Sequence, residues 1–369
     1  MRFDRIGETD RIIEIPQPLM KWFLQNKREM EWRSDPRPYY VWVSEIMLQQ
    51  TRVETVRPFF HRFIRELPDI GALARCGEEK LLKLWEGLGY YNRVRNMQKA
   101  AVIVTERYGG VLPDDPEKLR TLPGIGSYTA GAIASIAYGI PVPAVDGNVL
   151  RVLSRITGSE KNIDDPKVRS HFENLVSDVL NSREKPDPGI FNQALMELGA
   201  LICLPNGTAK CFECPLREMC RAYCTGNLDS IPVRSMKKPR RVEERTVLVV
   251  RDATRTVIRK RPEKGLLAGL WELPNLDGHL TDDEALHAAR QMGIRPVRVR
   301  ALPDAKHIFS HVEWHMKGYL ILSEDLEGLE DGYTAVEPEM TEREYSIPAA
   351  FARYTEYLDI KLGQKKFGG

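Results

Sequence analysis

Apolar residues recur at helical spacing through most of the chain up to about residue 230. From Val94 to Tyr108 they stand three or four positions apart, which is the period of an amphipathic helix. The segments 148–156 and 191–201 show the same spacing, and breaks rich in Gly and Pro separate such segments. Because the alternation typical of strands is scarce before residue 240, the pattern predicts an all-α domain over residues 1–229.

The pattern changes in the last third of the chain. Residues 246–250 and 256–258 alternate apolar and polar positions, 282–292 have helical spacing, and 307–322 are typical of strands and a turn. These features predict a smaller α+β domain over residues 246–369. The stretch between the two domains is polar, basic and Pro-containing, and it is predicted to be an interdomain linker over residues 230–245.

The predicted linker contains a basic run, formed by Lys237, Lys238, Arg240 and Arg241. Such a run is suited to lying along DNA, and it is equally typical of a solvated connector. The sequence leaves both interpretations open.

The composition is that of an ordinary globular protein, with 42% hydrophobic and 29% charged residues among 369 and a net charge of +2. So small a net charge neither demands nor excludes a nucleic-acid partner, since a local basic face binds phosphates whatever the total. The N-terminal segment has acidic residues and no apolar run typical of a secretory signal, and no stretch approaches the ~20 apolar residues of a membrane span. We therefore expect a reducing, cytoplasmic location.

Five of the six cysteines fall between residues 203 and 224. Four of them form the pattern C-x7-C-x2-C-x5-C directly after a predicted helix: Cys203, Cys211, Cys214 and Cys220. Thiolates so close in sequence can reach one centre, and both zinc and a [4Fe–4S] cluster accept four of them. Zinc ribbons usually have two C-x2-C pairs, whereas this chain has one, which favours the cluster; free buried thiols are the alternative. Cys224 is predicted to be a bystander and Cys76 a core residue.

Two glycines, Gly124 and Gly126, lie in the segment Leu-Pro-Gly-Ile-Gly just before a predicted helix. Glycines at a helix start let the backbone approach a ligand and direct free N–H groups at an anion such as a DNA phosphate. Taken alone, the segment fits a plain tight turn between two helices equally well.

Two carboxylates stand out by their surroundings. Glu45 is the one ionisable residue of the apolar stretch 41–48. Apolar neighbours raise the pKa of a carboxyl group, which suits it to act as a general acid near neutral pH. The alternative is a surface Glu on an amphipathic helix. Asp146 directly precedes a predicted helix, where Asp is also a favoured N-cap.

The hairpin, the Asp some twenty residues later and the four-cysteine loop together resemble the helix-hairpin-helix DNA glycosylases of the endonuclease III superfamily, over about residues 15–225. The segments Leu-Gln-Gln-Thr-Arg at 48–52 and Gly-Leu-Gly-Tyr-Tyr at 87–91 narrow the resemblance to the MutY-type adenine glycosylases. The resemblance implies a [4Fe–4S] cluster on the four cysteines, protonation of adenine N7 by Glu45, and stabilisation of the oxocarbenium ion by Asp146.

The resemblance implies further roles, each carried over at a matching position. Tyr128 would pack against the catalytic pair, and Asn148 would orient Asp146 and the attacking water. Four residues would insert into the base stack and contact the orphan guanine: Gln50, Thr51, Leu88 and Tyr90. Trp32 and Arg33 would lie near the adenine pocket, and Gln193 would have a lesser role. Relatives that also cut the strand carry a Lys where this chain has Tyr128, so we expect a monofunctional enzyme.

Residues 246–369 resemble the Nudix-like C-terminal domain of MutY proteins through the segment 265–272. A Nudix hydrolase needs paired carboxylates on a helix to hold magnesium, and residues 284–300 contain one Glu, so we expect no pyrophosphatase activity. The resemblance assigns Phe309, Ser310 and His311 to the recognition of 8-oxoguanine. A strand-edge turn with Phe in the core is the alternative.

The sequence as a whole favours a monomeric glycosylase that acts on adenine opposite 8-oxoguanine or guanine in double-stranded DNA. Flipping a base is easiest at a mismatch, which already gives some selectivity. Three other functions remain open: a thymine or uracil mismatch glycosylase, a nucleotide-pool hydrolase, and a non-catalytic iron–sulfur DNA-binding protein. Glu45 and Asp146 argue against the last, because a binding module needs neither.

Overall fold

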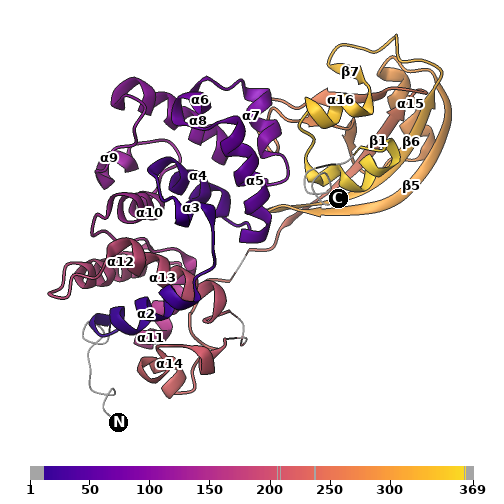
Figure 1. Ribbon diagram of the computed structural model, residues 1–369. Helices are drawn as coiled ribbons and strands as arrows, with labels where there is room; N and C mark the ends of the chain where they lie inside the picture. Colours follow the sequence, from indigo (N-terminus) through magenta and orange to yellow (C-terminus); the bar gives the residue numbers. More distant parts are fainter. Residues whose placement is uncertain (1–11, 206, 208, 237, 361, 363–369) are drawn as a thin grey trace. The chain divides into compact units, whose positions relative to one another are not determined.

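The computed structural model describes residues 12–205, 207, 209–236, 238–360 and 362 (Figure 1). The chain divides into two compact units that are not contiguous in sequence. The first comprises the chain up to Gln50, Leu67–Ala74 and Asn96–Met236, and the second comprises Thr51–Glu66, Arg75–Arg95 and the chain beyond Met236. Over the described residues, no helix is both long enough and apolar enough to cross a membrane.

The first unit is built from α-helices. Its helices are α2 (Pro16–Asn26), α3 (Glu31–Ser34), α4 (Pro38–Leu48), α6 (Ile70–Arg75), most of α8 (Asn92–Tyr108), α9 (Pro116–Arg120), α10 (Ser127–Tyr138), α11 (Gly147–Thr157), α12 (Pro166–Leu180), α13 (Pro188–Leu201) and α14 (Arg221–Cys224). The helices predicted over 94–108, 148–156 and 191–201 correspond to α8, α11 and α13.

An Asp–Pro dipeptide begins three of these helices. The carboxylates of Asp115, Asp165 and Asp187 accept hydrogen bonds from the free backbone N–H groups at the starts of α9, α12 and α13. In each helix Pro follows at the first position, where its missing N–H leaves no bond unmade and its fixed φ suits the helix. These local signals set the helix boundaries before any tertiary packing is considered.

One hydrophobic core of the first unit forms where α2, α11, α12 and α13 meet. Phe23 of α2, Phe172 of α12 and Phe191 of α13 are almost completely buried in it. Helix α10 packs against α4 on one side and α13 on another. This arrangement brings one end of α10 and the start of α11 close to α4 and α13, which carry the carboxylates described below.

The second unit contains a mixed sheet, with α5 (Val53–Glu66) and α7 (Glu78–Trp85) as its helices from the N-terminal half. The strands are β1 (Arg241–Arg251), β2 (Thr256–Lys260), β3 (Trp271–Glu272), β4 (Asn275–Asp277), β5 (Pro296–Ile308), β6 (Val312–Ser323) and β7 (Tyr333–Val336). Their order is β3-β2-β1-β6-β5, with β4 also paired to β1 and β7 to β2. β1 and β6 run parallel, whereas the other pairs are antiparallel.

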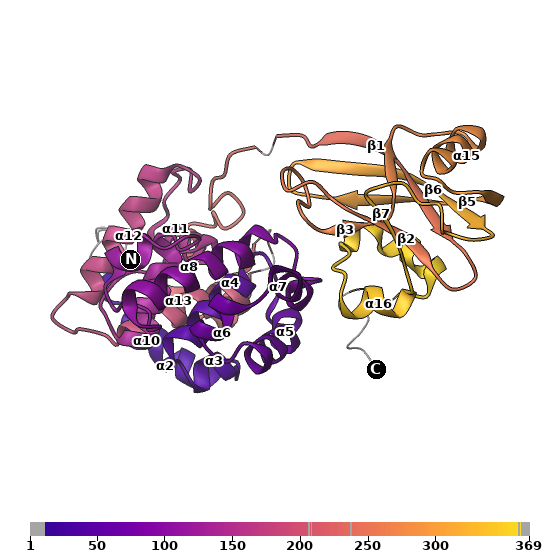
Figure 2. The ribbon, with the colours of Figure 1, turned by 90° about the horizontal axis from the view of Figure 1, so that it is seen from above.

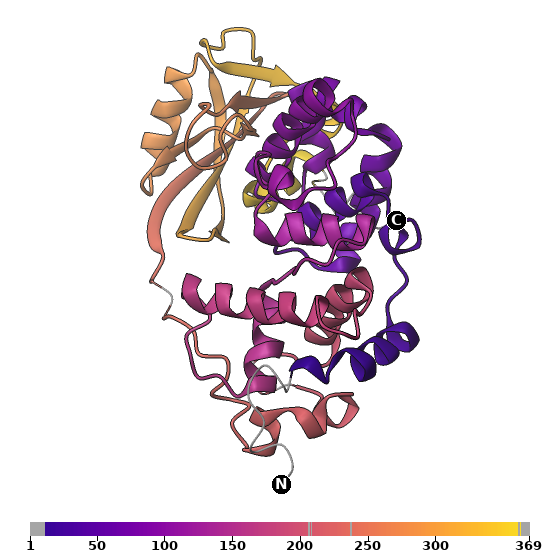
Figure 3. The ribbon, with the colours of Figure 1, turned by 90° about the vertical axis from the view of Figure 1, so that its left-hand side faces the viewer.

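Alternation along β1 sends its side chains to two separate cores. Val247 and Val249 face the C-terminal segments, which include α17 (Ala352–Thr355), whereas Leu248 and Val250 face α15 (Asp282–Gln291). Figures 2 and 3 show the sheet with α15 on one face and the C-terminal helices on the other. Because both faces of this strand are covered, residues 247–250 are all apolar, and the strand is marked by a short apolar run rather than by alternation of apolar and polar residues.

The linker prediction for residues 230–245 is wrong at its C-terminal end, because β1 already begins at Arg241 and pairs there with Val312 of β6. The first residues of β1 are largely exposed and, apart from Val242, charged, so no apolar alternation marks this part of the strand. Of the basic run, Lys237 lies outside the described residues, and Arg240 donates a hydrogen bond to the carbonyl oxygen of Phe309.

Candidate active site and its relation to known families

Asp146 caps the first turn of α11 and is itself held in a network of hydrogen bonds. Its carboxylate accepts from the backbone N–H of Val149 and from the side-chain amide of Asn148, both at 2.8 Å. Burial raises the pKa of Asp146, and these two hydrogen bonds oppose the rise by stabilising the carboxylate. The N-cap interpretation is therefore correct, and it leaves the carboxylate oriented by two donors.

Asn148 is fixed in turn by two neighbours. Arg151 donates to the side-chain oxygen of Asn148 at 2.9 Å and is anchored on the carbonyl oxygens of Gly199 and Cys203, each at 2.8 Å. Gly199 of α13 makes room for the Asn148 side chain, because a Cβ at that position would lie 2.7 Å from the Cβ of Asn148. The network therefore reaches from Asp146 to the first cysteine of the four-cysteine loop.

Glu45 lies buried in α4, with 7% of its surface exposed. The surface-Glu alternative is thus wrong. The hydroxyl of Tyr128 donates to Glu45 Oε2 at 2.5 Å. Burial raises the pKa of Glu45 to about 7, the Tyr128 hydrogen bond lowers it, the charge of Asp146 raises it and the charge of Arg33 lowers it.

These influences place Glu45, Tyr128 and Asp146 in one electrostatic environment. The pKa of Tyr128 is raised well above its ordinary value by burial and by the charges of both carboxylates. Near neutral pH, a group with a pKa of about 7 is present both as an acid and as a base. The site therefore combines a carboxyl group that can donate a proton with a second carboxylate held by hydrogen bonds.

The structure adds one residue that the sequence analysis missed. Glu197 of α13 is 1% exposed and forms bidentate hydrogen bonds with both Arg28 and Arg33, with donor–acceptor distances of 2.8–3.0 Å. Burial would raise the pKa of Glu197, but the hydrogen bonds from Arg28 and Arg33 outweigh it and lower the pKa to about 2. Arg33 is held in this way where its charge acts on Glu45.

The signal that could have identified Glu197 is the one used for Glu45, an ionisable residue in an apolar stretch, here 194–201. Gln193, the predicted residue of the same helix, donates to the carbonyl oxygen of Gly189 within α13 at 3.1 Å. Trp32 is buried next to Arg33 in the sequence.

The hairpin 122–126 has its apolar residues buried and its glycines exposed. Leu122 and Ile125 are buried, and the backbone N–H of Ile125 donates to the carbonyl oxygen of Leu122 at 3.1 Å. Gly124 has φ +79°, and a Cβ there would lie 2.9 Å from the Cβ of Asn96. Gly126 begins α10 without a side-chain cap, and its surroundings are open. The hairpin thus presents exposed backbone at a helix N-terminus.

The four predicted ligand cysteines occupy one loop after α13. Burial raises the pKa of Cys214 to about 12 and that of Cys220 to about 11, and neighbouring cysteine thiols contribute to both shifts. The guanidinium of Arg155 donates to the sulfur of Cys203 at 3.4 Å. In the part of the chain that the structure describes, no group of three or more His, Cys, Asp or Glu side chains is arranged to hold a single metal ion.

The thiols of Cys203, Cys211 and Cys220 contribute to the raised pKa of Cys214. Thiols grouped in this way nevertheless fit a cluster of several iron atoms, because such a cluster binds each thiolate at a different iron. A positively charged donor at Cys203 also suits a thiolate ligand. The predicted bystander Cys224 is exposed, whereas Cys76 is half-buried rather than a full core residue.

Comparison with known proteins agrees with this architecture. The family model described as "HhH-GPD superfamily base excision DNA repair protein" matches residues 43–178, and the NUDIX domain model matches residues 246–357. The mouse adenine DNA glycosylase is 36% identical over 353 residues, which are 80% of this chain and 68% of that protein. The human adenine DNA glycosylase is 32% identical, over 94% of this chain and 74% of that protein. The adenine DNA glycosylase of Buchnera aphidicola subsp. Acyrthosiphon pisum is also 32% identical, over 83% of this chain and 85% of that protein.

The chain belongs to the adenine DNA glycosylase family. It is a DNA glycosylase with a helix-hairpin-helix domain and a Nudix-like domain, which confirms the predicted fold class. Among solved structures, a thermostable thymine-DNA glycosylase (24% identity, TM-score 0.52, 58% of this chain and 97% of that one) and an endonuclease III–DNA complex (24%, 0.50, 59% and 97%) share the fold of the helical part.

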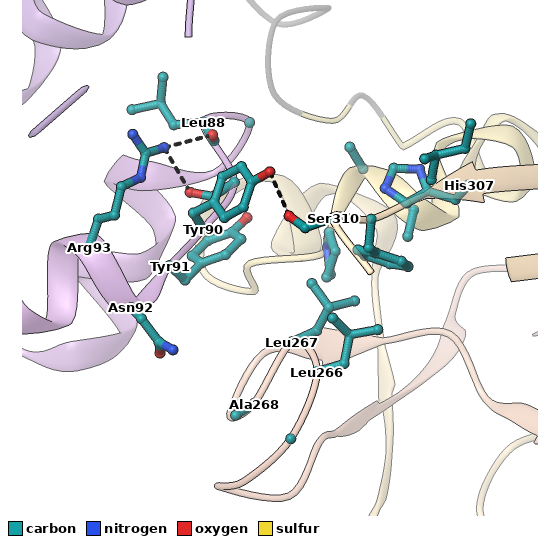
Figure 4. A pocket seen from close by; sticks show the side chains of 18 of the residues that line it. Leu88, Tyr90, Tyr91, Asn92, Arg93, Leu266, Leu267, Ala268, His307 and Ser310 are labelled. Atoms are coloured by element: carbon teal, nitrogen blue, oxygen red, sulfur yellow. Dashed lines mark hydrogen bonds between the residues drawn. The ribbon is translucent and has the colours of Figure 1, made fainter. Parts of the chain in front are cut away.

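In this glycosylase, two of the segments predicted to read the opposite base lie close together in the second unit. The loop 87–91 and the turn 309–311 between β5 and β6 line a cavity of about 670 Å³ (Figure 4). The hydroxyl groups of Tyr90 and Ser310 form a 2.9 Å hydrogen bond across it. Tyr90 is half exposed, whereas Leu88 is 5% exposed.

Arg93 shapes the loop 87–91 of the glycosylase. Its guanidinium donates to the carbonyl oxygens of Leu88 and Gly89 at 3.0 and 3.1 Å and lies 5.5 Å from the ring centre of Tyr90. These contacts support a strained position, because Tyr90 has a positive φ of 48°, which residues other than glycine rarely adopt.

The turn that follows β5 combines an anchored and an exposed side chain. Phe309 is partly buried, with its ring 5.0 Å from Trp314, so the strand-edge alternative is correct about where this side chain packs. Ser310 and His311 are exposed. Gln50 is the last residue of the first segment of the first unit, so its place relative to Tyr90 in the second unit stays a prediction. The contact predicted between Thr51 and the guanine also stays a prediction.

Proposed function

We propose that this glycosylase removes adenine mispaired with 8-oxoguanine or guanine in double-stranded DNA, as a monofunctional enzyme of base excision repair. The observation that carries the proposal is the buried Glu45, hydrogen-bonded to Tyr128 and within the electrostatic influence of Asp146. A binding protein has no need of a buried acid with a pKa of about 7. Similarity to the mouse and human adenine DNA glycosylases supports adenine as the base removed.

In the proposed reaction, the protonated Glu45 donates its proton to N7 of the flipped adenine. The bond between N9 and C1′ then breaks, its electron pair goes to the base, and adenine leaves as a neutral molecule. The positive charge left on the sugar faces Asp146, whose carboxylate is held in position by Asn148 and by the backbone of Val149. Water adds to C1′ and gives its proton to one of the two carboxylates.

Two further features support the finer points of this assignment. The position of the strand-cutting Lys is taken by Tyr128, whose hydroxyl is bound to Glu45, so no amine stands there to form a Schiff base. The cavity between residues 87–91 and 309–311 offers hydroxyl groups suited to N7–H and O8 of 8-oxoguanine.

We also propose that Cys203, Cys211, Cys214 and Cys220 hold a [4Fe–4S] cluster, which would fix the loop after α13. The influence of Cys203 and Cys211 on the pKa of Cys220 and the Arg155 donor at Cys203 support it. Because the cysteine ligands of an iron–sulfur cluster must stay reduced, a cytoplasmic location is consistent with this proposal. We further propose that the protein acts on chromosomal DNA as a monomer.

The test uses the protein in excess over four duplexes, with A opposite 8-oxoguanine, G or T, and U opposite G. Each reaction is split, and one half is treated with hot alkali. Cleavage of the adenine strand after alkali alone, fastest opposite 8-oxoguanine, is expected. Cleavage without alkali would contradict the monofunctional mechanism, and loss of uracil instead of adenine would contradict the substrate.

A further inference from the structure

A buried ion pair lies directly before the loop 87–91. Lys83 and Glu86 are one helical turn apart at the end of α7, with 13% and 4% of their side-chain surfaces exposed and 2.9 Å between Nζ and Oε2. Surface pairs of this spacing are common and contribute little. This pair differs because it is withdrawn from water, so each charge needs further partners.

Those partners come from the C-terminal part of the chain. Lys83 Nζ donates to the carbonyl oxygens of Thr341 and Tyr345, each at 2.8 Å, and Glu86 accepts from the backbone N–H of Ile347 at 2.9 Å. With Glu86 itself, these bonds use all three N–H donors of the ammonium group. Thr341 lies in α16 (Pro338–Arg343), and the other two residues follow it.

A further contact reinforces the same junction. The hydroxyl of Ser346 donates to the carbonyl oxygen of Leu82 at 3.3 Å. On the other side of the loop 87–91, Arg95 donates to the carbonyl oxygen of Ala268 at 2.8 Å and pairs with Glu78. The loop that carries Tyr90 is therefore fastened to the Nudix-like domain both before and after its turn.

We propose that Lys83 and Glu86 are positioning residues for recognition of the opposite base, an inference that rests on the proposed function. They hold the segment 341–347 against the end of α7, and this contact sets the spacing at which Tyr90 and Ser310 meet at 2.9 Å. Neither residue lines the cavity. Both act through the loop and the turn that do.

The chain offers a matched control. Lys260 and Glu79 form another ion pair between α7 and the Nudix-like domain, with 3.2 Å between Nζ and Oε1, but their side chains are 43% and 57% exposed. The two pairs join the same parts of the molecule and differ in burial and in their backbone partners. Lys260→Met should therefore leave base recognition unchanged.

The experiment measures single-turnover rates of adenine removal opposite 8-oxoguanine and opposite guanine for the full chain. For Lys83→Met and for Glu86→Gln, we expect the ratio of the two rates to fall roughly tenfold, while the rate opposite guanine stays within about threefold. The double variant Lys83→Met/Glu86→Met removes both charges of the pair together, so neither is left buried without the other, and it helps to separate lost positioning from misfolding. Its rate ratio should fall to the same extent.

A variant cycle with Ser310→Ala makes the test specific. If the pair acts through Ser310, Lys83→Met lowers the ratio in the unaltered chain but has little further effect when Ser310 is already Ala. Equal losses on both duplexes, or additive effects in the cycle, would overturn the positioning role. If the unaltered protein shows no preference for 8-oxoguanine, the proposed recognition itself fails, and this inference fails with it.

Discussion

Replacing Tyr128 with Phe removes one hydroxyl group from Glu45 and leaves the aromatic ring in place. That hydroxyl donates at 2.5 Å to a carboxyl group with 7% of its surface exposed, so solvent screening is small. The hydrogen bond favours the carboxylate and lowers the pKa of Glu45, whose value is about 7 with the bond in place. Its loss must therefore raise the pKa further.

The size of this rise follows from the strength of the bond. A hydrogen bond to a charged group contributes about 1.5–3 kcal/mol, and one pKa unit corresponds to about 1.4 kcal/mol. We expect Tyr128→Phe to raise the pKa of Glu45 by about one to two units. If only protonated Glu45 is active, the rate falls as pH rises through this pKa, so the alkaline limb of the profile moves to higher pH in the variant.

The assay is the single-turnover rate of adenine removal between pH 5 and about pH 10, with enzyme in saturating excess so that DNA binding does not limit it. Because a weaker acid gives up its proton less readily, the plateau below the limb should be lower in the variant. Tyr138→Phe is the control, since Tyr138 lies in the same helix and its hydroxyl donates to Leu112. An unmoved limb, or one shifted to lower pH, would refute the assigned role of the hydrogen bond, and the absence of any alkaline limb would refute Glu45 as the acid.

Three further predictions address the remaining parts of the site. Asp146→Asn keeps a good N-cap, so the denaturant midpoint should change little while the single-turnover rate falls at least about 100-fold; equal rates would exclude a role in the chemistry. Cys214→Ser should lower the iron content per chain, measured by metal analysis, together with the thermal unfolding midpoint, and full iron content would remove Cys214 from the ligand set. Gly124→Ala should lower the free energy of unfolding by about 1–3 kcal/mol, because the backbone there has φ +79° and the new Cβ would lie close to Asn96. Gly126→Ala, whose new Cβ would meet open space, should fold normally and weaken DNA binding in a filter-binding assay. Normal DNA affinity of this second variant would argue against phosphate contact at Gly126.

Local signals made the helical framework predictable, together with the burial of Glu45 and the position of Asp146 at the start of α11. Glu45 stood out because a charged residue interrupts an apolar stretch, and Asp146 because it precedes a helix with a clear apolar period. The same signal is present at Glu197, whereas the resemblance to the glycosylase family points to Gln193 as the functional residue of that helix. Burial of Glu197 depends on Arg28 and Arg33, which lie more than 160 residues away.

Other features depend on contacts that no local pattern reports. Lys83 and Glu86 belong to a segment, 78–86, whose alternation of charged and apolar residues is typical of a helix with one solvated face. Their burial follows from backbone groups 258 and 261 residues further along the chain. The start of β1 resembles a linker for a related reason, since its exposed half carries charged residues on both faces.

Because the segments of the second unit are far apart in the sequence, they are synthesised at different times. Thr341 follows Lys83 by 258 residues, so a ribosome adding about 5–20 residues per second makes it on the order of 10–50 s later. Until then α7 has emerged without the segment that covers its charged pair, while the core formed by α2, α11, α12 and α13 is already complete in sequence. A premature stop codon before residue 341 would therefore damage both ends of this unit, leaving the loop 87–91 unfastened as well as removing the last strands or helices.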